Sequence, residues 1–163
     1  MKIAGLIRHM IVVLAVLAAG CAATFNRTAG LKAEERAVYD ENQRWAHAAQ
    51  QQNVDALLSF YAPDAVIAWP DMPAAVGEAG VRQAWNQFFA FPGYAGVTWT
   101  PERIVIAASG DLASDYGRIE TTWYSSTGEN SEIDKYLTVW KKVNGNWKVL
   151  YDTYATNAPP PKP

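Results

Sequence analysis

Histidine and cysteine are almost absent from this chain of 163 residues, which contains two histidines and one cysteine. His9 lies in an N-terminal apolar segment and His47 falls on the polar side of an expected helix, so neither is placed to serve a nucleophilic triad. A His/Cys metal cluster, a phosphate-binding loop and a dinucleotide glycine motif are also missing from the sequence. We therefore expect no metal and no cofactor, and any catalysis would use carboxylates, tyrosines and arginine.

Long hydrophobic runs are lacking as well. After Lys2 and Arg8 the uninterrupted apolar run covers residues 10–19, whereas a membrane-spanning helix needs about 20 residues. A basic start, a short apolar centre and small residues at its end predict a secretion signal over residues 1–20. A short anchor that is kept in the mature protein is the alternative.

Positive charge is scarce in the mature chain. The sequence has 14 basic and 16 acidic residues, and the signal removes Lys2 and Arg8, which leaves 12 basic residues and a balance of about −4. Nucleic-acid binding needs a basic patch, so we expect no nucleic-acid partner.

The single cysteine lies at the end of the predicted signal. The segment LAAGC, residues 17–21, resembles the lipobox of bacterial lipoproteins, in which the cysteine is acylated and becomes the new N-terminus. The resemblance implies that Cys21 is lipidated and anchors the protein to a membrane, with each buried methylene adding about 0.8 kcal/mol. Ala22 is not the aspartate that marks inner-membrane retention, so we expect an exported lipoprotein on the periplasmic face of the outer membrane.

The remaining chain divides into a spacer at residues 21–32, a domain at 33–157 and a proline-rich tail at 158–163. Helical periodicity predicts helices at 33–52 and after Gly77, and Asn53 can cap a short helix at 54–61 that Pro63 ends. Strands are expected at 65–69, 97–107, 112–124, 132–143 and 147–154, the last four separated by turn residues. Helices first and hairpins afterwards indicate an α+β fold with an antiparallel sheet.

This order of elements, together with the segments 44–70, 77–89 and 136–154, resembles the SnoaL-like superfamily, also called nuclear transport factor 2-like or ketosteroid-isomerase-like. The resemblance implies a cone-shaped fold in which three N-terminal helices pack on a strongly curved antiparallel sheet and enclose a pocket. Such folds host enzymes, binding proteins and assembly modules alike, so the fold does not determine the function.

The resemblance also implies where steroid-isomerase chemistry would lie. The helix-one tyrosine of that family falls at Trp45, its aspartate before a proline falls at Trp69, and its second acid falls near Thr138. Indole can neither abstract a proton nor stabilise an enolate as a phenol does. Steroid isomerisation by that mechanism is therefore not expected.

The direction in which Asp152 points depends on the last hairpin. A two-residue turn at Asn144-Gly145 would place Asp152 opposite Leu137, and a three-residue loop would place it opposite Tyr136. We prefer the three-residue loop because it sorts the side chains into a mixed and an apolar face. The mixed face then carries Tyr136, Thr138, Trp140, Leu150, Asp152 and Tyr154, and the apolar face carries Leu137, Val139, Val149 and Tyr151.

The mixed face is predicted to line the pocket, and the resemblance adds Tyr116, Arg118 and Glu120 to it. The candidate catalytic residues are Asp152, Glu120, Arg118 and Tyr136, and the candidate ligand-binding residues are Trp45, Trp69, Tyr116, Thr138, Trp140 and Tyr154. Arg118 could pair with Asp152 or Glu120, and we expect Asp152 to be held as a carboxylate by Arg118, Tyr136 or both. An internal ion pair that only fixes the sheet is the alternative.

Three functions remain open. The first is a binder of a small apolar or aromatic molecule in the cone. The second is a cofactor-free acid–base enzyme, an isomerase, cyclase, dehydratase or hydrolase, that uses Asp152 or Glu120. The third is an assembly module whose apolar sheet face pairs with a second copy, and a homodimer is compatible with all three.

Overall fold

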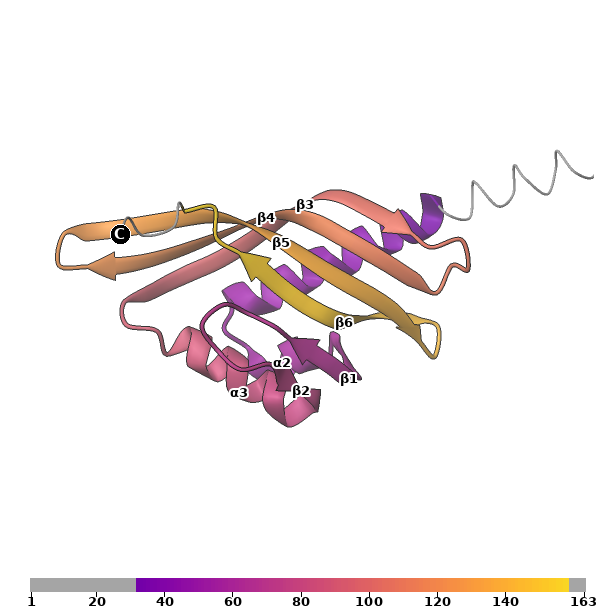
Figure 1. The fold of residues 1–163 in the computed structure, drawn as a ribbon, viewed down its shortest axis with the longest axis horizontal. Helices are drawn as coiled ribbons and strands as arrows, with labels where there is room; N and C mark the ends of the chain where they lie inside the picture. Colours follow the sequence, from indigo (N-terminus) through magenta and orange to yellow (C-terminus); the bar gives the residue numbers. More distant parts are fainter. Residues whose placement is uncertain (1–31, 159–163) are drawn as a thin grey trace, which may run out of the picture. The chain divides into compact units, whose positions relative to one another are not determined.

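The computed structural model describes residues 32–158, and within this range one mixed sheet is packed against helices (Figure 1). The first helix covers residues 32–50. The other elements are α2 (Val54–Leu58), β1 (Tyr61–Ile67), β2 (Ala75–Val76), α3 (Gly77–Phe89), β3 (Tyr94–Ile106), β4 (Leu112–Ser125), β5 (Gly128–Val143) and β6 (Asn146–Ala155). The predicted α+β fold class is confirmed. The signal, Cys21, most of the spacer and residues 159–163 of the tail lie outside the described residues.

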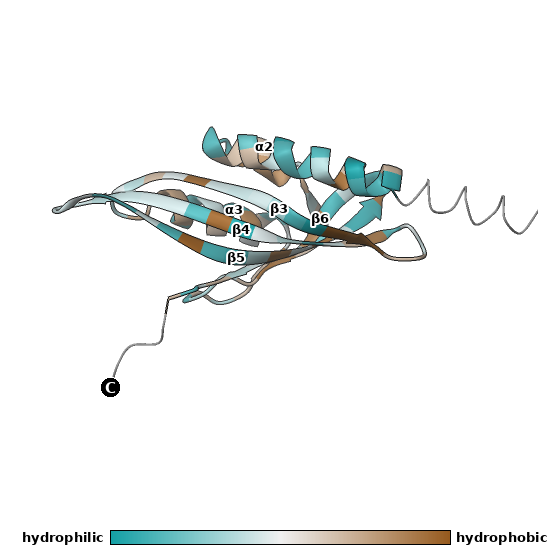
Figure 2. Ribbon diagram, turned by 90° about the horizontal axis from the view of Figure 1, so that it is seen from above, coloured by the Kyte–Doolittle hydropathy of each residue, from teal (hydrophilic) through white to brown (hydrophobic). Residues whose placement is uncertain are grey.

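The helices follow the predicted pattern of apolar side chains. In the first helix Val38, Asn42, Trp45 and Ala49 are buried along one face, at the spacing of a 3.6-residue period. The side chain of Asn53 accepts a hydrogen bond of 3.0 Å from the amide of Ala56, so the predicted cap of α2 is present. Figure 2 shows the first helix running along one face of the long strands.

The sheet has the strand order β2-β1-β6-β5-β4-β3. All neighbouring pairs are antiparallel except β1 and β6, which are parallel. The strand expected at 65–69 begins earlier, at Tyr61, which had been expected to end the helix before it. Pro63 is tolerated within β1 because the register between β1 and β6 shifts between Tyr61 and Val66, where a ladder amide is not required.

The register of the last hairpin differs from the one preferred from the sequence. Val143 pairs with Asn146, so the turn has two residues, and Asn144 and Gly145 take positive φ values of 51° and 82°. The pairing then shifts at Leu150, which is an extra residue between two paired positions. Asp152 consequently lies opposite Thr138, and not opposite Tyr136 as expected.

The extra residue at Leu150 is a β-bulge, and it explains why Asp152 nevertheless faces inward, as predicted. Asp152 is 6% exposed, and Val149 on the same face is fully buried. The predicted place of Val149 on the outer face was wrong, while Leu150 is the extra residue and is partly exposed. The extra residue in β6 restores the expected alternation only beyond position 150.

The outer face of the sheet carries exposed apolar side chains. They include Val105, Leu112, Tyr116, Ile133, Leu137 and Tyr151. Pairing with a second copy across this face stays a prediction, which sedimentation velocity at high protein concentration would test. Among the helices of residues 32–158, none has the length and apolarity needed to cross a bilayer.

Candidate functional site

Aromatic side chains enclose a small inner chamber between the sheet and the helices. Its lining residues are Trp45, Trp69, Trp85, Phe88, Val97, Trp99, Ile119, Tyr136, Thr138, Asp152 and Tyr154. The chamber has a volume of about 20 Å³. A water molecule needs roughly 10–15 Å³ of such space, so the chamber has room for little more than one water.

Asp152 is the carboxylate of this chamber. The hydroxyl of Tyr61 donates to its Oδ2 at 2.6 Å, and the indole of Trp85 donates to the Tyr61 oxygen at 2.9 Å. Burial raises the pKa of Asp152 to about 6, while hydrogen bonding by Tyr61 and Trp69 acts in the opposite direction. Asp152 can therefore accept or release a proton near neutral pH.

Tyr61 is a site residue that the sequence analysis did not identify. Burial is the largest cause that raises its pKa well above the usual value, followed by the charge of Asp152, so the phenol keeps its proton and remains a donor. Its signal in the sequence was weak, because Tyr61 follows directly on an apolar helical run and precedes Pro63 by two residues.

A second buried carboxylate, Asp115, lies on β4 and was also missed. The hydroxyl of Tyr136 donates to its Oδ1 at 2.9 Å, and the side-chain amide of Asn42 donates to its Oδ2 at 2.6 Å. Burial raises the pKa of Asp115 to about 6, against the effect of these hydrogen bonds. Asp115 is coupled to the chamber through Tyr136, which is one of the chamber walls.

Three further polar groups on the chamber walls have no hydrogen-bond partner within the described part of the chain. They are the indole nitrogens of Trp45 and Trp99 and the hydroxyl of Thr138. All three side chains are more than nine-tenths buried. A buried polar group without a partner costs about 1–3 kcal/mol, so the chamber favours a guest atom that takes part in hydrogen bonds.

A larger groove opens beside the chamber and shares Trp69, Phe88 and Tyr154 with it. The groove has a volume of about 620 Å³. Small-molecule sites occupy roughly 300–1,000 Å³, so the groove has the size of a ligand site and the chamber does not.

The family to which the chain belongs is shown by its sequence. Residues 42–150 match the model of the SnoaL-like domain. The chain belongs to the SnoaL-like domain family. No match is found among the curated proteins.

Solved structures agree on the fold. A ketosteroid isomerase-like protein from Erwinia carotovora atroseptica is 19% identical with a TM-score of 0.68, over 77% of this chain and 98% of that one. An NTF2-like protein with a cystatin-like fold from Novosphingobium aromaticivorans is 15% identical with a TM-score of 0.68, over 84% and 88% of the two chains. At such identities the likeness concerns the fold alone, and the predicted fold of helices on a curved sheet is confirmed.

Six of the residues proposed from the sequence line the chamber of this SnoaL-like domain together. They are Trp45, Trp69, Tyr136, Thr138, Asp152 and Tyr154. Trp140 is fully buried but is not a wall of the chamber, and its ring centroid lies 5.7 Å from that of Trp45. The positions at which the resemblance placed the isomerase residues therefore do meet in space, with indole and hydroxyl groups in place of phenol and acid.

The prediction that Tyr116, Arg118 and Glu120 share the pocket face is wrong. Gly117 pairs with Tyr136 and Asp115 with Thr138, so the odd-numbered residues of β4 face the chamber.

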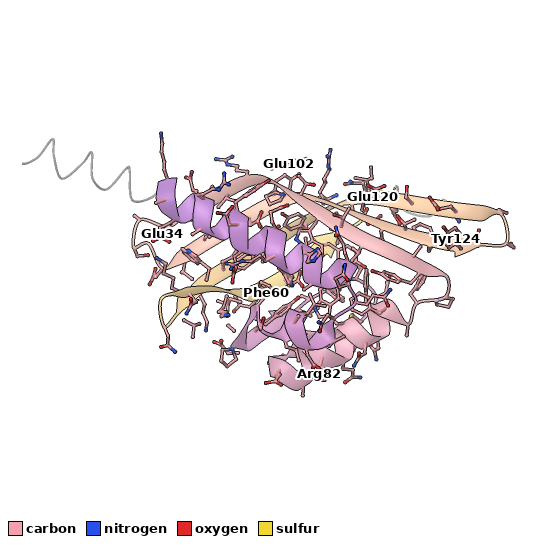
Figure 3. All side chains as sticks on the ribbon, turned by 180° about the vertical axis from the view of Figure 1, so that it is seen from behind. Glu34, Phe60, Arg82, Glu102, Glu120 and Tyr124 are labelled. Carbon is pink, nitrogen blue, oxygen red and sulfur yellow. The ribbon has the colours of Figure 1, made fainter. Side chains whose placement is uncertain are left out.

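The exposure of Tyr116 and Arg118 agrees with the pairing. Tyr116 is 45% exposed and Arg118 is exposed, so Arg118 does not hold Asp152. Figure 3 labels Glu120 on the long strands, and Glu120 is a wall of neither the chamber nor the groove. The alternation of Ala113, Asp115, Gly117 and Ile119 was the available signal for Asp115.

Proposed function

We propose that this SnoaL-like domain binds a small apolar or aromatic molecule in the groove, with a polar atom directed towards Asp152. The observation that carries the proposal is the sharing of Trp69, Phe88 and Tyr154 between a groove of about 620 Å³ and the chamber that contains Asp152. The rings supply apolar contact area, and the unpartnered groups of the chamber supply specificity.

The binding proposal predicts saturable binding that a partly filled groove weakens. Thr121 is a wall of the groove, so Thr121→Phe should reduce its volume and weaken binding about tenfold or more. Thr122→Phe is the matched control, because its side chain points to the other face of the same strand. Calorimetry and thermal melting with a panel of hydrophobic molecules measure both effects.

Two results would count against the binding proposal. If no member of the panel raises the melting temperature, the domain does not bind this class of molecule. If Thr121→Phe and Thr122→Phe bind equally well, the ligand occupies a different site.

A second candidate function is cofactor-free acid–base catalysis, favoured by the raised pKa of Asp152. Asp152 would transfer the proton. The hydroxyl of Tyr136 already donates to Asp115, so developing negative charge would meet the indole of Trp99 and the hydroxyl of Thr138 instead. Glu120 is not a wall of the chamber, so this candidate rests on Asp152.

Mass spectrometry of a bound ligand before and after incubation decides between the two candidates. A binder leaves the ligand unchanged. An enzyme converts it, and Asp152→Asn would then stop the conversion.

We further propose that the domain is exported and tethered to the cell envelope through Cys21, on the strength of the LAAGC segment. Metabolic labelling with a fatty acid should mark the wild type and not Cys21→Ser. Labelling of both proteins, or of neither, would remove the lipoprotein proposal.

A further inference from the structure

The groove combines aromatic walls with carboxylates. Its walls include the rings of Trp69, Phe88 and Trp123, and its carboxylates are Asp71, Glu132 and Asp134. The residues that line it include no lysine, arginine or histidine. Aromatic faces and carboxylates both attract positive charge, so the two kinds of wall favour the same guest.

The carboxylates of the groove take part in none of the ion pairs within residues 32–158. Glu132 accepts a hydrogen bond from Thr156 at 2.9 Å, and Oδ1 of Asp134 accepts one from the amide of Asn157 at 2.8 Å. Asp134 is only 8% exposed, so its charge acts in a partly dry environment. Both hydrogen bonds involve neutral groups, and the negative charge remains available to a ligand.

Lys135, the neighbour of Asp134 in the sequence, forms no ion pair with it within residues 32–158. Its Nζ atom donates to the carbonyl of Thr156 at 3.0 Å and to the side chain of Asn157 at 2.9 Å. Lys135 is exposed and is not a wall of the groove.

The hydroxyl of Tyr94, another wall of the groove, is buried without a hydrogen-bond partner in the described part of the chain. Burial raises its pKa to about 12, so the phenol is neutral at physiological pH. Its oxygen can accept a hydrogen bond from a guest that carries donors.

The carboxylates of the groove all act on the hydroxyl of Tyr154. Burial is the first cause that raises its pKa, and the charges of Asp134, Asp71, Glu132 and Asp152 add to the effect. Tyr154 is a wall of both the groove and the chamber, so the negative field extends to the place where the two meet.

We propose that the groove takes a small organic cation, an amine with an apolar or aromatic body. This inference rests on the proposed binding function and names the class of ligand. The amine lies against the aromatic rings near Glu132 and Asp134, and the apolar body fills the remaining volume of the groove.

Three probes of similar shape and different charge test the ligand class. Benzylammonium is the cation, benzyl alcohol is its neutral analogue and benzoate is an anion of similar size. Calorimetry should show the cation binding about tenfold tighter than the neutral probe, and the anion binding weakest. The advantage of the cation should shrink as salt is added, because salt screens exposed charges.

The double variant Glu132→Gln, Asp134→Asn should reduce the preference for benzylammonium over benzyl alcohol to within about threefold, because it removes both charges and nearly keeps the shape of both side chains. Glu102→Gln is the control, because it changes a carboxylate to an amide on the outer face of β3, away from the groove. This variant should keep the full preference for benzylammonium. A melting curve for each variant confirms that it folds.

The outcomes separate the two proposals. If benzyl alcohol binds as tightly as benzylammonium, the domain binds apolar molecules and the inference on charge is wrong. If the double variant keeps the preference, the cation is held elsewhere and the inference is also wrong. If none of the three probes binds while hydrophobic molecules do, the charge inference fails alone, and if nothing binds at all, both proposals fail.

Discussion

Replacing Asp152 with asparagine should remove much of the pH dependence of the protein's stability and stabilise the fold at neutral pH. The carboxyl has a pKa of about 6 in the folded chain, against about 3.9 in an unfolded one. The folded state therefore keeps a proton that the unfolded state releases between these values. The stability contributed by the protonated carboxyl is complete below pH 4 and is lost as the pH rises through 6.

The expected change in unfolding free energy is large for a single side chain. A pKa shift of one unit corresponds to about 1.4 kcal/mol, so Asp152 should cost the wild type about 3 kcal/mol of unfolding free energy between pH 4 and pH 7. Asparagine keeps an oxygen that can accept the hydrogen bond from Tyr61 but carries no charge to desolvate. Urea unfolding at a series of pH values measures the difference.

The control for this series is Glu102→Gln, which removes an exposed carboxylate and should leave the slope of stability against pH unchanged. Some slope should persist in Asp152→Asn, because burial also raises the pKa of Asp115 to about 6. An Asp152→Asn variant whose stability falls with pH as steeply as that of the wild type would show that Asp152 titrates normally in the folded protein.

Gly117→Ala should destabilise the domain by about 3 kcal/mol and lower its melting temperature by about 10 °C. A Cβ atom at this position would lie 2.1 Å from the carbonyl oxygen of Thr100 and 2.8 Å from a ring carbon of Tyr136. The carbonyl belongs to the backbone of the neighbouring strand and cannot rotate away. The close approach coincides with a shift of register between Pro101 and Arg103 in β3.

Gly96→Ala is the matched control for this substitution. Gly96 lies in β3, and a Cβ atom there meets nothing within 4 Å. Alanine should leave the stability unchanged or raise it by about 0.4–1 kcal/mol, because it restricts the unfolded chain. Equal melting temperatures for Gly117→Ala and Gly96→Ala would mean that β4 relaxes without cost. A glycine at position 117 would then not be required for the packing of the Tyr136 ring.

The positions of the helices and strands were largely predictable because they depend on local patterns. The period of 3.6 residues in the first helix, the cap at Asn53 and the alternation in the four long strands each reflect chemistry within a few residues. The start of β1 was not predictable in this way. Tyr61 continues an apolar helical run, and only its parallel pairing with β6 makes it a strand residue.

The geometry of the candidate site was predictable only in part. The family resemblance and the alternation of β5 and β6 were enough to predict that four side chains line the chamber together. They are those of Trp45, Trp69, Thr138 and Tyr154. Arg118 was placed on the wrong face, because a single step in register reverses every side chain of a strand.

The amino-acid sequence is enough to establish the family, an N-terminal segment with the pattern of a secretion signal, and the carboxylates and phenols that a site could use. Which of these groups meet depends on the tertiary structure. Tyr61 and Asp152 are 91 positions apart and form a hydrogen bond only because β1 lies beside β6. A bulge at Leu150 turned Asp152 inward despite the shorter turn, since one extra residue restores the alternation that the turn alone would have reversed.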